Sequence, residues 1–192
     1  MRHSRKLRLS AILALGAAAA VMLAAGASAG QAFRETFHEE ETLLLNNFCD
    51  VPGLTVELEI VRDGTVHAVP HGPDGLPHFL FHVQQTEVLT NLANDKSVTV
   101  VLTITDKDLR VTDNDDGTLT LLVLATGNAV AYGEDGKAIA RNPGQTRSEI
   151  LIDHGGTPTD PSDDEFLAFL GVVKESTGRT DDFCAAVVSA LS

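Results

Sequence analysis

Apolar and polar residues alternate along several stretches of strand length. From Leu54 to Ile60 every second residue is apolar and the residues between are Thr or Glu. A similar alternation returns over Ser97–Thr105, with Val101 as the one apolar exception on the polar face. A period of two predicts strands with one face on a core and one face in water. Residues His78–Thr90 and Arg147–Asp153 have a similar extended character. The pattern therefore predicts a protein built mainly of β-strands.

The run Lys107–Lys137 organises this pattern, because it contains two Asp-Gly turns, Asp116-Gly117 and Asp135-Gly136. Asp-Gly between apolar runs is a strong hairpin signal, since both residues tolerate a positive φ at low cost. Between the turns, Thr118–Ala125 begins with Thr and Leu in alternation and ends apolar on both faces. A strand that becomes buried on both sides is expected in the middle of a sheet.

The first half of the chain contains two further signals of chain reversal. Asp63-Gly64 predicts a hairpin that pairs the strand from Leu54 with Thr65–Val69. The stretch Val69–His78 holds three prolines and two glycines, which predicts an irregular loop.

Toward the C-terminus the hydrophobic period changes from two to that of a helix. Ser162 to Glu165 match a capping box, and apolar residues follow at helical spacing until Gly178, a candidate C-cap. A second short helix is expected from about Asp181, with Cys184 on its buried face.

Together these elements predict a mainly β fold of about eight to ten short antiparallel strands. An up-and-down barrel is the preferred architecture because the strands follow one another as a meander. A β-sandwich is the alternative, and one or two C-terminal helices complete either fold.

Residues 1–29 have the pattern of a signal peptide. A basic start precedes the apolar run Leu9–Ala25, and Ala27-Ser28-Ala29 supplies a cleavage site. Residues 30–192 are then expected to be a single secreted β domain, with 30–47 as a loose N-terminal segment. No membrane span is expected after cleavage.

Ten basic and 27 acidic residues remain after residue 29, which gives the mature chain a formal charge of −17. Such a charge repels phosphate backbones and anionic membranes, so we do not expect the protein to bind nucleic acids. The chain has two cysteines, Cys49 and Cys184, and export to an oxidising compartment predicts a disulfide between them.

Two groups of residues resemble metal sites. The acidic turn Asp113–Gly117 fails the calcium-loop register, because Val123 occupies the position of the bidentate Glu; we interpret it as a hairpin tip. Four histidines flank the proline-rich loop: His67, His71, His78 and His82. The loop could bring His67 or His71 near His78. Surface histidines are the expectation, with a zinc or copper site as the alternative.

The chain offers no catalytic motif, and we predict no catalytic residue, no cofactor and no metal. The candidates for contact with a small ligand at a barrel mouth are Tyr132, Arg141, Asn142, Arg147 and His78.

Three runs and the closing DDFC also resemble a known group of proteins. The runs are VTDNDDGTLTLLVLATGN, YGEDGKAIARNPGQTR and ILIDHGGTPTDPSDDEF. They are similar to uncharacterised secreted actinobacterial proteins of unassigned function. The resemblance covers most of the mature chain and implies export, a bacterial source and paired cysteines.

The function expected from these observations is that of a secreted, non-catalytic β domain. It would bind a small molecule or a component of the cell envelope or extracellular space. The alternative is a small secreted enzyme, a hydrolase or isomerase, with a site at the barrel mouth.

Overall fold

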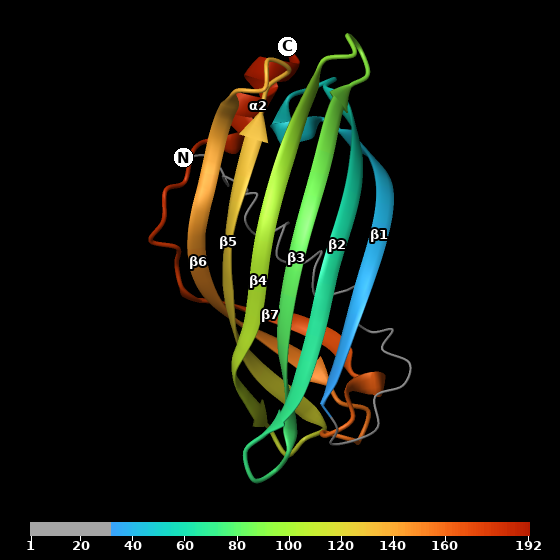
Figure 1. Cartoon of the computed structure of the whole chain (residues 1–192), viewed down its shortest axis with the longest axis vertical. Coiled ribbons are helices and arrows are strands. Elements are labelled where there is room, and N and C mark those ends of the chain that lie inside the picture. The colour runs from blue at the N-terminus through green and yellow to red at the C-terminus, as the bar shows by residue number, and fades with distance from the viewer. Residues whose placement is uncertain (1–31) are drawn as a thin grey trace.

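A computed structural model describes residues 32–192, in which seven strands form one antiparallel sheet in chain order (Figure 1). The strands are β1 Phe33–Asn46, β2 Thr55–His71, β3 Leu76–Asn91, β4 Ser97–Asp113, β5 Thr118–Tyr132, β6 Ala138–Asp153 and β7 Glu165–Lys174. The mainly β, antiparallel meander is confirmed, with seven long strands in place of eight to ten short ones. Within the described residues β1 pairs only with β2 and β7 only with β6. The predicted signal peptide lies outside the described residues.

Both turns of the run Lys107–Lys137 are confirmed as hairpin tips. Gly117 connects β4 to β5 with φ 91°, and Gly136 connects β5 to β6 with φ 73°. Glycine adopts these left-handed conformations without the strain that a side chain adds. Residues Thr118–Ala125 lie in β5, an interior strand, although the middle position of the sheet belongs to β4.

Two predictions for the N-terminal half are wrong. Residues 33–46 form β1, an edge strand, where a loose segment is predicted. Asp63-Gly64 makes no turn, because β2 continues through it from Thr55 to His71. The alternation of β2 stays in phase across Gly64, and the ring of Phe37 on β1 occupies the space that a side chain at Gly64 would fill. The missing side chain therefore serves packing rather than a reversal.

The irregular loop predicted over Val69–His78 is only the four residues 72–75. Pro70 and Pro77 lie opposite each other in the β2–β3 ladder. They lie beyond Ala68, the last residue of β2 that pairs with β1, and before Leu80, the first of β3 that pairs with β4. At these positions a proline's missing N–H costs no hydrogen bond to the outer neighbours.

The helix predicted from Phe166 is also wrong, because residues 165–174 form β7. Three register shifts interrupt its pairing with β6, and each one leaves a residue of β7 without a partner in the ladder: Leu167, Leu170 and Val173. A bulge every third residue places Phe166, Phe169 and Val172 opposite Ile152, Ile150 and Ser148. The apolar spacing that resembles a helix is thus accommodated by a bulged strand.

The two faces of the sheet differ in burial, and we call the face that carries the core the inner face and the other the outer face. On β4 the inner residues are Val98, Val100, Leu102, Ile104, Asp106 and Asp108. Two apolar clusters lie at opposite ends of the strands. The helix-end core contains Phe48, Val56, Leu89, Val98, Val100, Leu102, Ala131, Ala140, Val187 and Leu191. The far-end core contains Leu76, Leu119, Leu121 and Ile152.

The C-terminal helix α2, Phe183–Leu191, packs on the helix-end core and confirms the second predicted helix. Val187 and Leu191 are fully buried, and each stabilises the packing by roughly 2 kcal/mol. The Asp182 side chain caps the first turn by accepting from Ala185 N at 3.0 Å. At the other end Asn91 and Asn94 donate to the carbonyl of Leu191 at 2.9 and 3.0 Å.

The disulfide is confirmed: Cys49, in the short turn η1 (Phe48–Asp50), is bonded to Cys184 in α2. It joins the beginning of the sheet to its last element across 135 positions of sequence.

We expect the double variant Cys49→Ser/Cys184→Ser to lose about 2–5 kcal/mol of unfolding free energy, because a long closed loop restricts the unfolded chain. Urea unfolding followed by circular dichroism measures the loss. The oxidised wild type and the wild type under reductant are the controls, and reductant should reproduce the effect of the double variant. Equal unfolding midpoints in all samples would show that packing alone holds α2.

Candidate ligand site on the inner face

Strand register places aromatic rings and carboxyl groups side by side on the inner face between the two cores. Phe81 of β3 is directly opposite Asp106 of β4. Phe79 and Asp108 lie two residues further along the same strands, and side chains two apart share a face. Phe33 of β1 joins them because Phe33 and Phe79 are both paired with Ala68 of β2.

The three phenylalanines form one aromatic group. The rings of Phe79 and Phe81 are stacked, with centroids 5.7 Å apart and planes inclined by 12°. Phe33 meets Phe79 edge to face at 6.1 Å. All three are only half-buried, so part of this apolar surface remains open to a ligand.

The carboxyl group of Asp108 is buried, with 6% of the residue exposed. Its Oδ2 accepts a hydrogen bond from Phe79 N at 2.8 Å. The backbone pairing between β3 and β4 ends at Leu80 and Lys107, and the β4–β5 register shifts immediately after Asp108. Phe79 N therefore has no backbone partner on β4, and the Asp108 side chain accepts its hydrogen bond instead. Burial raises the pKa of Asp108 to about 7, and the neighbouring charge of Asp106 acts in the same direction.

Asp106 is the less satisfied of the two acids. Its Oδ1 is buried and has no hydrogen-bond partner in the described part of the chain. Burial raises the pKa of Asp106 to about 6. Across the face the residue opposite Asp106 is Ala125 of β5. A buried oxygen of this kind needs a donor that the described residues do not supply, such as a bound water or a ligand group.

A separate polar network borders this group toward α2. Arg62 Nε donates to Gln85 Oε1 at 2.7 Å, and Gln85 donates in turn to Glu87 Oε1 at 2.5 Å. Glu39 and Glu41 approach Arg62 at 3.6 and 3.7 Å. Burial raises the pKa of Glu87, while the hydrogen bond from Gln85 and the charge of Arg62 oppose the shift. Its members satisfy one another, so this network positions β1–β3 instead of leaving groups free for a ligand.

The residues predicted as ligand contacts do not form one site. Arg141 and Asn142 are adjacent on β6, with Tyr132 on the neighbouring strand, and Arg147 lies further along β6. His78 lies at the opposite end of the sheet, beside the β2–β3 hairpin. Their role in ligand contact stays a prediction.

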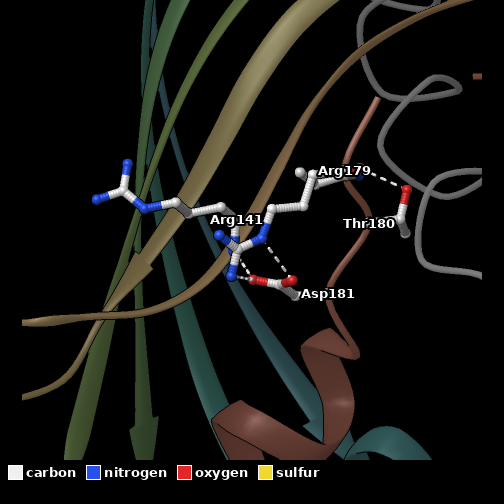
Figure 2. Close-up of polar contacts among 5 residues, drawn as sticks. Arg141, Arg179, Thr180 and Asp181 are labelled. Atoms are coloured by element: carbon white, nitrogen blue, oxygen red, sulfur yellow. Dashed lines mark hydrogen bonds and ion pairs between the residues drawn. The ribbon is translucent and has the colours of Figure 1, made fainter. Parts of the chain in front are cut away.

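The structure gives Arg141 and Asn142 a packing role. Figure 2 shows the segment before α2 running beside β6 at this point, with the Arg141 guanidinium pointing away from Asp181. The backbone N of Arg141 donates to Asp181 Oδ2 at 3.0 Å, and its carbonyl accepts from Asp181 N at 3.2 Å. Arg179 holds both oxygens of Asp181 at 2.7 Å, and these contacts keep the pKa of Asp181 low. Thr180 Oγ1 donates to Asn142 Oδ1 at 3.3 Å.

Arg147 is placed differently, because its Nε is buried and without a hydrogen-bond partner in the described residues. It lies opposite Leu124 of β5 and Lys174 of β7. The acidic turn is a hairpin tip: Asp113 and Asp116 accept from the backbone N of Asp115 and Thr118.

Two depressions of the described surface are open and lie elsewhere. One lies beside α2 and contains Arg179, Asp181 and Asp182. The other lies over β1–β3 near His38, Asp63 and His82.

Sequence analysis missed the five residues of the inner-face group, although β4 carried a signal. Its apolar phase runs Val98, Val100, Leu102, Ile104 and then continues with Asp106 and Asp108. Two acidic residues at buried positions of a strand indicate either hydrogen bonds that stabilise the fold or a functional site.

Comparisons of the chain with protein-family models, curated proteins and solved structures found no match. In residues 32–192 no helix is long and apolar enough to cross a membrane. The same residues contain no group of three or more His, Cys, Asp or Glu arranged to hold a metal ion.

We expect Asp108→Asn to raise stability at pH 8. A carboxyl whose pKa is raised on folding stabilises the fold when protonated, and this stabilisation is lost as pH rises from about 4 through about 7. Asparagine stays neutral and can still accept from Phe79 N. The gain should be on the order of 1–4 kcal/mol, at about 1.4 kcal/mol for each pKa unit.

Thermal or urea unfolding between pH 5 and pH 8 measures this effect. The wild type should lose stability over this range, and Asp108→Asn should lose less. Asp74→Asn, in the exposed β2–β3 loop, is the control. A variant less stable than wild type at pH 8 would show that the charged carboxylate is required.

Proposed function

We propose that this protein is an exported binding protein that holds a small amphiphilic molecule on the inner face of its sheet. The observation that carries the proposal is the buried, unpartnered Oδ1 of Asp106 beside the stacked rings of Phe79 and Phe81. A ligand with an apolar body and a donor or cationic head satisfies both features at once, because aromatic faces attract cations and carboxylates accept from donors.

The charge of the chain supports a cationic head group. Its formal net charge is −13, which raises the local concentration of cations and disfavours anionic ligands. A neutral donor remains compatible with Asp106 and Asp108 in their protonated forms.

Export is part of the proposal. The signal-peptide pattern of residues 1–29 supports it, and so does the disulfide between Cys49 and Cys184, since such bonds persist in oxidising compartments. The similarity to secreted actinobacterial proteins is consistent with this destination.

For the architecture we favour a closed barrel over a sandwich. A sandwich needs two sheets, whereas all seven strands belong to one sheet in chain order. Closure would require the edges β1 and β7 to meet.

An enzyme is the alternative, and one observation favours it. Asp106 and Asp108 lie on one face with raised pKa values of about 6 and about 7, and two neighbouring carboxyls of this kind can exchange a proton with a substrate. A hydrolase or isomerase would use them as acid and base.

The binding proposal is tested by NMR titration of the ¹⁵N-labelled protein with 2-phenylethylamine, 2-phenylethanol and 3-phenylpropanoate. The amine should bind most tightly and the carboxylate least, with amide shifts at Phe79, Phe81 and Asp106. Phe81→Ala and Asp106→Asn should each weaken binding of the amine by about fivefold, a loss of about 1 kcal/mol.

Leu80→Ala is the matched control, because Leu80 lies between the two phenylalanines on the outer face and is 40% exposed. It should change the affinity by less than about twofold. Equal weakening by Leu80→Ala and Phe81→Ala, or no inner-face shifts with any of the three probes, would refute the site.

A further inference from the structure

Five of the seven histidines of the chain gather on the outer face of β1–β3. The strand registers place them there: His38 is opposite Asp63, His82 is opposite Thr65, and His78 is opposite Val69. His67 and His71 flank Val69 at a spacing of two on β2 and share its face. The outer face therefore concentrates imidazole groups on three neighbouring strands.

His71 and His78 form the closest pair of this set. The tight β2–β3 hairpin brings their ring centroids to 4.8 Å, with planes inclined by 47°. Metal–nitrogen bonds of about 2.1 Å place the ring centroids of two ligands on one ion roughly 4.5–5.3 Å apart, for nitrogen–metal–nitrogen angles between about 90° and 110°. The 4.8 Å between the two centroids lies within this range.

The orientation of His78 is also suited to a ligand. Its Nδ1 lies 3.4 Å from the carbonyl oxygen of Asp108. A carbonyl only accepts, so Nδ1 carries the proton and Nε2 keeps its lone pair. Histidine ligands in metalloproteins are commonly oriented by such a hydrogen bond from the second ring nitrogen.

Two other histidines of this face, His38 and His82, already have polar partners. His38 contacts Asp63 at 2.8 Å and Glu40 at 3.2 Å, which raises its pKa. His82 Nδ1 lies 3.0 Å from Thr105 Oγ1. His71 is exposed at the end of β2, and its ring already lies beside that of His78.

From this geometry we infer that His71 and His78 form a binding site for a divalent transition metal such as Zn²⁺, Cu²⁺ or Ni²⁺. Imidazole nitrogens favour these ions over Ca²⁺ and Mg²⁺. No third His, Cys, Asp or Glu joins the pair within residues 32–192. Water completes the coordination, which leaves positions open for an external ligand and makes the affinity modest.

Isothermal titration of the full chain with Zn²⁺, in a buffer that does not bind metals, tests the inference. The wild type should bind Zn²⁺ in the micromolar range, and long-range ¹H–¹⁵N spectra should show coordination at Nε2 of His78. His71→Asn and His78→Asn should each weaken the affinity by at least about tenfold. Circular dichroism confirms that the variants fold.

His67→Asn is the matched control. His67 lies on the same face of β2 as His71, with Val69 between the two histidines. Its affinity for Zn²⁺ should stay within about twofold of wild type. An equal loss in all three variants would indicate diffuse binding by many histidines and overturn the two-residue site. The absence of Zn²⁺ binding by the wild type would overturn it as well.

Discussion

The docking of α2 on the helix-end core is the contact on which the arrangement of the inner face depends. A helix of nine residues is too short to be stable in isolation, so its tertiary contacts must hold it. Val187 and Leu191 supply the apolar part of this contact, and Asn91 supplies a polar one at the C-terminus. The bond from Cys184 to Cys49 restrains the helix at its start.

The length of α2 limits how much of the sheet it covers. Nine helical residues span about 14 Å, whereas the 17 residues of β2 or β4 span about 55 Å. Beyond the reach of α2 the inner face changes character, first to the network of Arg62, Gln85 and Glu87 and then to the phenylalanines and Asp106. The proposed ligand site lies where the helix no longer supplies a cover, which explains why half-buried rings persist on a core face.

The two edges of the sheet are protected in different ways. β1 carries the acidic run Glu39–Glu41 and only a short apolar stretch near its end, so its edge repels another copy of itself. β7 is apolar over most of its length, with Leu170 and Val173 among its exposed residues. Its three bulges disrupt the regular row of backbone groups, which disfavours pairing with a strand of another copy.

The sequence by itself determined the features whose signals are local. Alternation predicted the strands, Asp-Gly predicted the tips at Gly117 and Gly136, and helical spacing predicted α2. Periodicity and turn chemistry act over a few residues, so neighbours in sequence are enough to specify them. The pairing of Cys49 with Cys184 was predicted because the chain has two cysteines and is expected in an oxidising compartment, not from any geometric argument.

Only the tertiary structure decided the elements whose local signals had two solutions. Residues 165–174 suit a helix by spacing, but the edge of β6 offered a ladder that a bulged strand could complete. Gly64 is typical of a turn, but it lies within β2, where the ring of Phe37 packs in the space that a side chain would occupy. The group of Phe79, Phe81 and Asp106 depends on the register of β3 against β4, and a shift of one residue would move it to the other face. Register is set by the whole sheet, so no single stretch of the sequence could place that site.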